Sequence, residues 1–141
     1  SVRVPALCEL QSFANVHHLV SRVDGTLAPG KTSVDLLRAC FPGGSITGAP
    51  KVRAMEIIAE LEKKPREAYT GSLGYINRDG SLDLNILIRT MIQSQKEGES
   101  VVQFRAGAGI VADSIAEAEL VESRHKAKGL VNALKSDVRI I

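Results

Sequence analysis

The chain begins with short alternations of apolar and polar residues in which β-branched and aromatic side chains are frequent. This pattern is typical of β-strands, and it predicts strands over residues 7–13 and 14–23. After a Gly- and Pro-containing loop, the next apolar run predicts a short helix over 34–39. Thr32 or Ser33 would cap this helix, because a hydroxyl oxygen there can accept a bond from a free N–H of the first turn.

A glycine-rich segment occupies residues 43–50 and leads into apolar positions with helical spacing. These positions predict a helix that has Pro50 as its first residue and ends near Glu62. Its first turn carries Lys51 and Arg53, although positive charge there costs about 0.3–1 kcal/mol per residue. Either both cations point into water, or an anion bound at the glycine loop compensates them.

The second half of the chain alternates between apolar runs and short polar turns. Strands are predicted over 68–77, 82–95 and 100–111. Connections this short imply an antiparallel meander. A last helix is expected over 115–135, and Ser114-Ile115-Ala116-Glu117 is a capping-box sequence at its start. The order of elements predicts an α+β fold, with antiparallel sheets and packed helices, in a single domain over 1–141.

Composition narrows the range of functions. The 141 residues are 44% hydrophobic, which is enough to bury a core. Net charge is +2 and aromatics make up 4%, so a nucleic-acid surface is not expected. No apolar run is long enough to cross a membrane, so a membrane span is not expected either. Cys8 and Cys40 are isolated, without metal or redox spacing. This cysteine usage favours a reducing, cytoplasmic location.

Two features of the predicted strands suggest a bound carboxylate. Arg89 lies in the otherwise apolar stretch 84–92, and a charge there needs a partner. Its planar fork suits a carboxylate ligand, although an exposed or internally paired arginine is the alternative. Gly107 and Gly109, with Ala108 between them, end the last strand. They either let backbone N–H groups approach a ligand or mark a β-bulge.

The final predicted helix carries three charged residues on one narrow arc. At about 100° per residue, Glu119, Glu122 and Lys126 span about 60° of its circumference. Two carboxylates one turn apart can present oxygens to a hard cation such as Mg²⁺, and Lys126 could reach an anion bridged by it. The alternative is a solvated face with an ordinary i,i+4 Glu–Lys pair.

The segment Gly43-Gly44-Ser45-Ile46-Thr47-Gly48-Ala49-Pro50-Lys51 resembles the signature of the chorismate-utilising enzymes. These include anthranilate, aminodeoxychorismate, isochorismate and salicylate synthases. The segment is most similar to aminodeoxychorismate synthase (para-aminobenzoate synthase) component I, because anthranilate synthases more often have Ala-Gly-Thr at 43–45. The resemblance extends over about 1–134 and implies part of an anthranilate-synthase-component-I-like, chorismate-binding fold.

The resemblance also implies roles for individual residues. The expected catalytic residues are His18, from the segment His18-Leu19-Val20-Ser21, and Ser45. The expected substrate-binding residues are Tyr75, Arg89, Gly107, Ala108, Gly109 and Lys126. The expected Mg²⁺ ligands are Glu119 and Glu122. A structural role remains the alternative for His18, Ser45 and Tyr75.

The implied reaction is a Mg²⁺-dependent transfer of ammonia to chorismate, which gives 4-amino-4-deoxychorismate on the route to folate. A glutamine amidotransferase partner would supply the ammonia. Family members are much longer, and patterns resembling Asp-Leu-x-Arg-Asn-Asp-Leu and Pro-Ile-Lys-Gly-Thr do not occur in this chain. We therefore expect a C-terminal fragment that holds about half of the site and is inactive alone. Free strand edges favour a homodimer or swapped assembly. The alternatives are an anthranilate synthase component I fragment and a non-catalytic chorismate-binding or assembly module.

Overall fold

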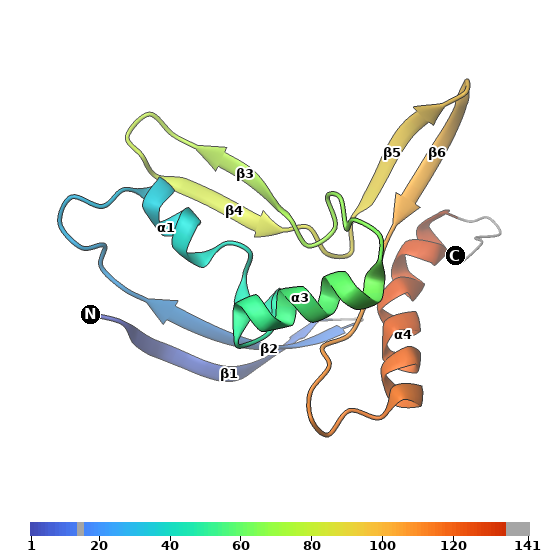
Figure 1. Ribbon diagram of the computed structural model, residues 1–141, viewed down its shortest axis with the longest axis horizontal. Helices are drawn as coiled ribbons and strands as arrows, with labels where there is room; N and C mark the ends of the chain where they lie inside the picture. The colour runs from blue at the N-terminus through green and yellow to red at the C-terminus, as the bar shows by residue number, and fades with distance from the viewer. Residues whose placement is uncertain (14–15, 135–141) are drawn as a thin grey trace. The chain divides into compact units, whose positions relative to one another are not determined.

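The computed structural model describes residues 1–13 and 16–134. Its elements in chain order are β1 (Arg3–Phe13), β2 (Val16–Asp24), α1 (Ser33–Cys40), α2 (Gly44–Thr47), α3 (Lys51–Glu62), β3 (Ser72–Ile76), β4 (Leu82–Ile86), β5 (Met91–Lys96), β6 (Glu99–Phe104) and α4 (Ala116–Leu134) (Figure 1). All strand pairs are antiparallel, which confirms the α+β prediction.

Internal contacts divide the chain into two compact units, residues 1–39 and 40–141. The single domain expected over 1–141 stays a prediction. No helix in the described part of the chain is long and apolar enough to cross a membrane.

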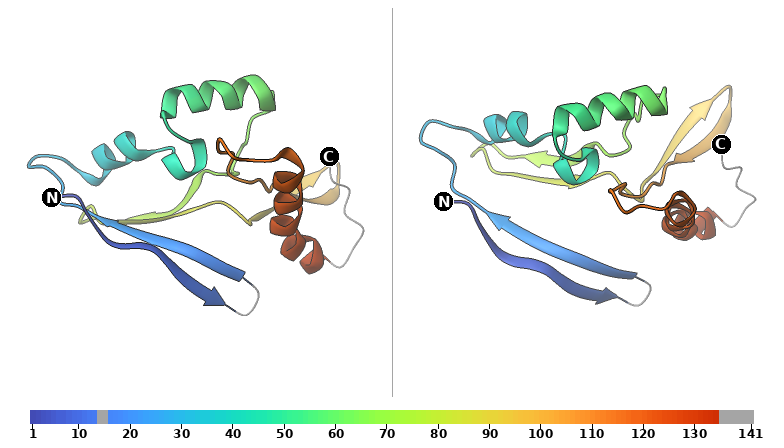
Figure 2. Two further views of the ribbon diagram at one scale, coloured as in Figure 1. Left: turned by 90° about the horizontal axis from the view of Figure 1, so that it is seen from below. Right: turned by 60° about the horizontal axis from the view of Figure 1, so that its bottom comes forward.

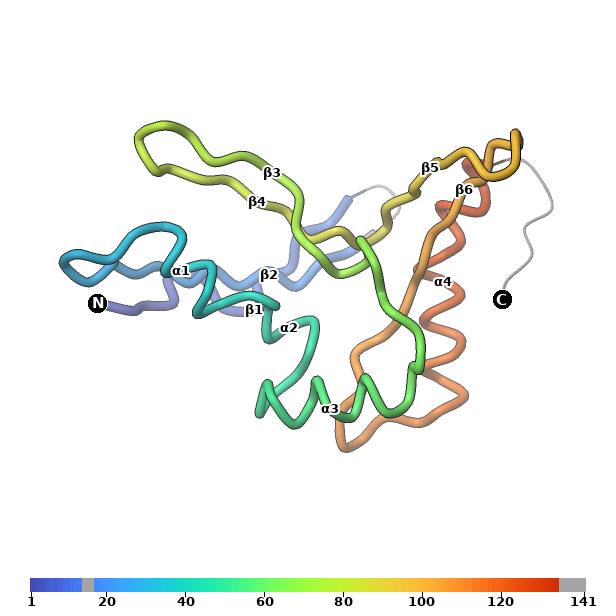
Figure 3. The backbone as a smooth tube through the Cα atoms, turned by 45° about the horizontal axis from the view of Figure 1, so that its top comes forward, coloured from blue at the N-terminus to red at the C-terminus, as the bar shows by residue number. Residues whose placement is uncertain are grey.

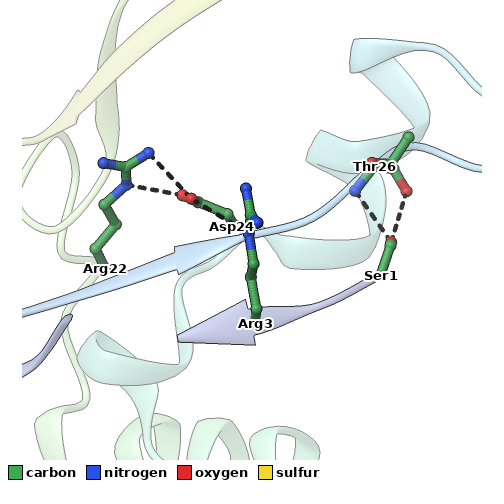
Figure 4. Close-up of polar contacts among 5 residues, drawn as sticks. All are labelled: Ser1, Arg3, Arg22, Asp24 and Thr26. Carbon is green, nitrogen blue, oxygen red and sulfur yellow. Dashed lines mark hydrogen bonds and ion pairs between the residues drawn. The ribbon is translucent and has the colours of Figure 1, made fainter. Parts of the chain in front are cut away.

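The first unit is built on the hairpin of β1 and β2, in which Phe13 lies opposite Val16 and Arg3 opposite Asp24. The register shifts twice between Arg3 and Glu9. At the open end of the hairpin, Asp24 accepts hydrogen bonds of 2.9 and 3.0 Å from Arg22 and lies 3.9 Å from the Arg3 guanidinium (Figure 4). The two predicted strands are confirmed, apart from Ala14 and Asn15, which lie outside the described residues.

Helix α1 begins with a reciprocal cap. The Thr32 N–H donates to Asp35 Oδ2 at 2.9 Å, and the Asp35 N–H donates to Thr32 Oγ1 at 3.3 Å. The bond from the Thr32 N–H, and then the one from its hydroxyl, hold the pKa of Asp35 below its usual value. Of the two capping residues predicted for this helix, Thr32 is the one that makes the cap.

The glycine-rich segment contains one helical turn, α2, before α3 begins. Gly48 ends this turn with φ of 102°, a conformation that favours glycine. Pro50 is the N-cap of α3 and not its first helical residue, so the predicted start is one residue early. The helix ends at Glu62, as predicted, and Lys63 follows in the left-handed conformation with φ of 51°.

The predicted three-stranded meander is wrong. The four strands form two separate hairpins, β3–β4 and β5–β6, and β4 does not pair with β5. The strand predicted over 82–95 is interrupted after Ile86, where the Ile88 N–H donates to the Ile86 carbonyl at 2.9 Å and closes a tight turn. The two hairpins leave this corner in different directions (Figure 3). The strand predicted over 100–111 ends earlier, at Phe104.

The chain buries little of its apolar surface. Among the described residues Ala127 on α4 is the one buried apolar side chain, while large apolar side chains on every strand and helix of the two units stay at least partly exposed. Leu7 and Leu10 on β1, for example, are 73% and 66% exposed. Within each unit the described apolar residues therefore do not form a closed core, and their apolar faces are available to other surfaces.

Candidate functional site

The expected metal ligands lie on the first half of α4. The carboxylate of Glu119 accepts a 2.6 Å hydrogen bond from the Ser114 hydroxyl at Oε1. Its other oxygen, Oε2, is buried and has no hydrogen-bond partner in the described part of the chain. Ser114 does not form the predicted capping box, because its hydroxyl bonds the Val111 N–H and Glu119.

Glu122 and Lys126 form an ion pair one turn further along, with 2.5 Å between Oε1 and Nζ. The ordinary i,i+4 Glu–Lys pair, which was the alternative to a metal site on this helix face, is thus present. It is partly exposed: 52% of the Glu122 side chain and 34% of the Lys126 side chain are accessible. A pair of this kind is worth roughly 0.3–0.5 kcal/mol and can open readily.

The two glutamates fit Mg²⁺ in part. Their carboxylate oxygens are the hard ligands this cation takes, and the buried free oxygen of Glu119 lacks a partner that a cation would supply. Among residues 1–13 and 16–134 no group of three His, Cys, Asp or Glu side chains gathers around one point. Water, substrate or other side chains would therefore have to complete the coordination of a Mg²⁺ ion.

Arg89 does not lie on a strand, contrary to the prediction. It occupies the corner between β4 and β5 with φ of 51°, and its side chain is exposed. The alternative of an exposed arginine is therefore the observed one. No acidic side chain within the described ranges pairs with it. Its guanidinium thus remains available to a carboxylate ligand.

Gly107, Ala108 and Gly109 belong to the irregular segment that leads from β6 into α4 (Figure 2). The predicted strand has already ended at Phe104, so the glycines do not mark a bulge. A Cβ at Gly107 would lie 3.0 Å from the Tyr69 hydroxyl oxygen, whereas nothing lies within 4 Å of such an atom at Gly109. A side chain at Gly107 would therefore be tight against Tyr69, whereas Gly109 has open space beside its backbone.

Arg66 connects the end of α3 to this glycine segment. Its Nε and Nη2 donate to the two carboxylate oxygens of Glu62 at 2.9 and 2.5 Å. Its guanidinium carbon lies 5.9 Å from the centre of the Tyr69 ring, a cation–π arrangement. The bonds from Arg66 hold the pKa of Glu62 below its usual value, and Glu62 in turn raises the pKa of Arg66. Arg66 thus fixes the tyrosine that packs on Gly107.

Sequence reasoning missed this cluster. Its signal was the i,i+4 spacing of Glu62 and Arg66, but the intervening Lys63-Lys64-Pro65 indicates a helix end. Beside the cluster lies an open pocket of about 270 Å³. It is lined by Pro42, Ile46, Thr47, Met55, Ile58, Ala59, Glu62, Lys64, Arg66 and Thr70.

The cations at the start of α3 have partners within the chain. Lys51 Nζ donates to the Cys40 carbonyl, the last of α1, at 2.9 Å. Arg53 pairs with Glu56 at 3.0 Å and with Glu60 at 3.4 Å. A cation is favoured at the carboxyl end of a helix, so Lys51 stabilises the end of α1. An anion at the glycine loop is not needed to compensate either residue.

The remaining expected site residues lie on separate elements. Tyr75 is on β3, opposite Asp83, and is 59% exposed. Ser45 is exposed on α2. His18 is on β2, with its ring edge-to-face against Phe13 at 5.9 Å, and it belongs to the first unit. The roles expected for all three remain predictions.

Comparison with known proteins gives the family. Residues 1–132 match the family described as chorismate binding enzyme. The chain belongs to this family. It is 48% identical over 137 residues to anthranilate synthase component 1 of Synechocystis sp., and 49% identical over 134 residues to that of Bacillus subtilis. These alignments cover 96% and 95% of the chain but 27% and 25% of the relatives.

Solved structures of family members share the fold. Anthranilate synthase component I from Streptococcus pneumoniae aligns with a TM-score of 0.77 and 46% identity, over 92% of this chain and 29% of that one. A putative 2,3-dihydroxybenzoate-specific isochorismate synthase from Bacillus anthracis aligns with a TM-score of 0.79 and 30% identity, over 97% of this chain and 36% of that one. The expected partial chorismate-binding fold is therefore confirmed.

Proposed function

We propose that the chain forms part of the chorismate site of an anthranilate synthase component I. The observation that carries this proposal is its identity of 48%, 49% and 46% to three proteins of that name, over nearly its whole length. The names favour anthranilate synthase over aminodeoxychorismate synthase. Because the chain spans 25–29% of these proteins, it would act together with the other residues of such a site.

In this proposal Glu119 and Glu122 hold Mg²⁺, which supplies positive charge to a carboxylate of chorismate. Glu122 would serve as a metal ligand with its carboxylate free of Lys126, whose ammonium could then contact the substrate. The free guanidinium of Arg89 binds a second carboxylate in a two-pronged geometry. These roles use the unpartnered oxygen of Glu119 and the unpaired charge of Arg89.

The other expected residues complete the proposed wall of the site. Gly107, Ala108 and Gly109 offer backbone N–H groups, and Tyr75 offers its hydroxyl to the substrate. Ser45 would be the hydroxyl near the reacting ring, and His18 would be the catalytic histidine, since an imidazole can give a proton to the departing hydroxyl. Ammonia from a glutamine amidotransferase partner would add to the ring as that hydroxyl leaves as water, and loss of the enolpyruvyl group as pyruvate would then give anthranilate. The exposed apolar faces support a homodimer or swapped assembly when the chain is alone.

A second candidate, aminodeoxychorismate synthase component I in the cytoplasmic route to folate, is favoured by Gly43-Gly44-Ser45 in the glycine-rich segment. A chimera separates the two. Residues 1–132 would replace the matching segment of the Bacillus subtilis anthranilate synthase component 1, and the product from chorismate, ammonia and Mg²⁺ would be identified by chromatography and mass spectrometry.

We expect anthranilate from the chimera. Formation of 4-amino-4-deoxychorismate, which keeps the enolpyruvyl group, would instead establish the second candidate. A folded chimera that binds no chorismate would contradict both and leave a non-catalytic assembly module. The host protein with its own segment is the control for folding and for activity.

A further inference from the structure

Ser114 lies in a turn just before α4, and its hydroxyl joins two different parts of the chain. Its Oγ lies 3.0 Å from the Val111 nitrogen and 2.6 Å from Glu119 Oε1. The Ser114 N–H also donates to the Val111 carbonyl at 3.0 Å, so the turn closes independently of the hydroxyl. Ser114 and Glu119 are both only partly exposed.

The number of protons fixes the direction of these bonds. A serine hydroxyl has one proton to donate and two lone pairs to accept. The Val111 N–H brings its own proton, so Oγ is the acceptor in that bond. The hydroxyl proton is then free to be donated to Glu119 Oε1. A backbone amide on one side thus aims the serine proton at the carboxylate on the other.

The hydrogen bond from Ser114 makes the two carboxylate oxygens of Glu119 different from each other. Oε1 is occupied by Ser114, while Oε2 is buried and unpartnered among the described residues. A carboxylate held at one oxygen loses rotational freedom, and its other oxygen keeps a defined position. Residues that hydrogen-bond a metal-ligating carboxylate orient it in this way.

We propose that Ser114 is a positioning residue, which turns Glu119 so that Oε2 is presented to a divalent cation. The proposal rests on the Mg²⁺ site proposed above and adds to it a residue that does not touch the metal. It also explains why the hydroxyl bonds Glu119 and not the first turn of α4. The same hydroxyl would leave Glu119 free to rotate if it capped the helix.

The test is calorimetric titration of the 141-residue chain with Mg²⁺ alone. Ser114→Ala should weaken Mg²⁺ binding by about 10-fold or more, the usual effect of removing a partner of a metal ligand. Ser114→Thr keeps the hydroxyl and should restore the affinity of the unchanged chain. Ser100→Ala is the matched control, because it removes one serine bond, to Gln93 at 2.7 Å, on β6. It should leave Mg²⁺ binding unchanged.

A second measurement needs no metal. The side-chain carboxyl ¹³C resonance of Glu119 should shift in Ser114→Ala and stay in place in Ser100→Ala, while circular dichroism checks that α4 remains helical. Unchanged Mg²⁺ affinity and an unchanged Glu119 resonance in Ser114→Ala would overturn the role of Ser114. If Glu119→Gln binds Mg²⁺ as well as the unchanged chain, or if neither binds it, the magnesium site itself is overturned.

Discussion

Replacing Lys126 by methionine should change metal binding and substrate binding in opposite directions. In the free chain Lys126 Nζ pairs with Glu122 Oε1 at 2.5 Å, so the ammonium competes with Mg²⁺ for the same carboxylate. With 52% of the Glu122 side chain and 34% of the Lys126 side chain exposed, this i,i+4 pair is worth about 0.3–0.5 kcal/mol. Methionine keeps the length and the apolar stem of the side chain while removing its charge.

Freeing Glu122 from this pair should tighten the binding of Mg²⁺ alone by roughly 2-fold, since 1.4 kcal/mol corresponds to a factor of ten. Chorismate binding in the presence of Mg²⁺ should weaken, because the proposed contact of Lys126 with the substrate is lost. Both affinities can be measured by calorimetry on the same preparation. Lys128→Met is the control, since Lys128 has the same charge two residues further along α4 and points in another direction. Weaker binding of Mg²⁺ alone by Lys126→Met would refute the reasoning.

Three further predictions concern the surrounding residues. Arg89→Lys keeps the charge but loses the two-pronged geometry, so calorimetry should show chorismate binding weakened by about 10-fold. Gly107→Ala should weaken it as well, because the new Cβ would lie 3.0 Å from the Tyr69 hydroxyl oxygen, so that the Tyr69 side chain or the glycine segment must shift by a few tenths of an ångström; equal affinity would contradict this. The low pKa of Glu62 means that its pair with Arg66 stabilises the fold above the ordinary pKa of 4.5 and is lost as pH falls through the folded value. A ¹³C NMR titration should show the Glu62 carboxyl titrating below 4.5, and a midpoint at or above it would contradict the prediction.

The residue types correctly predicted those helices and hairpins that are formed by interactions between residues close together in the sequence. The cap of α1 needs only Thr32 and Asp35, three residues apart. The start of α3 follows from the glycine-rich segment and Pro50, and its apolar stripe runs to Glu62. The antiparallel hairpins follow from short turns between apolar runs. In each case the interaction that forms the element lies within a few residues of sequence.

The break between β4 and β5 could not be predicted in this way. Residues 84–92 form an almost continuous apolar run, which has the pattern of one long strand. The Leu87 N–H still donates to the Gly71 carbonyl at 2.9 Å, in register with the pairing of β3 and β4, and the strand does not continue because the Ile88 N–H turns back to the Ile86 carbonyl. Both hydrogen bonds are made by backbone groups, so they cannot be predicted from the residue types at these positions. Arg89 was therefore placed on a strand when it belongs to a corner.

The sequence indicated which residues belong to the candidate site. It did not indicate which other residues bond to them or pack against them. The spacing of Glu119, Glu122 and Lys126 was sufficient to place them on one helix face. That Ser114 bonds Glu119 could not be inferred, since the same serine fits a capping box. The contact of Tyr69 with Gly107 joins residues far apart in the sequence and needs the folded chain.

The central claim is that this chain binds chorismate through a magnesium-dependent site. The most direct test is calorimetric titration of the 141-residue chain with chorismate, first with Mg²⁺ and then with a chelator. The account predicts binding with Mg²⁺ that is lost with the chelator and in Glu119→Gln. Absence of binding with Mg²⁺, or the same affinity in all three conditions, would contradict it.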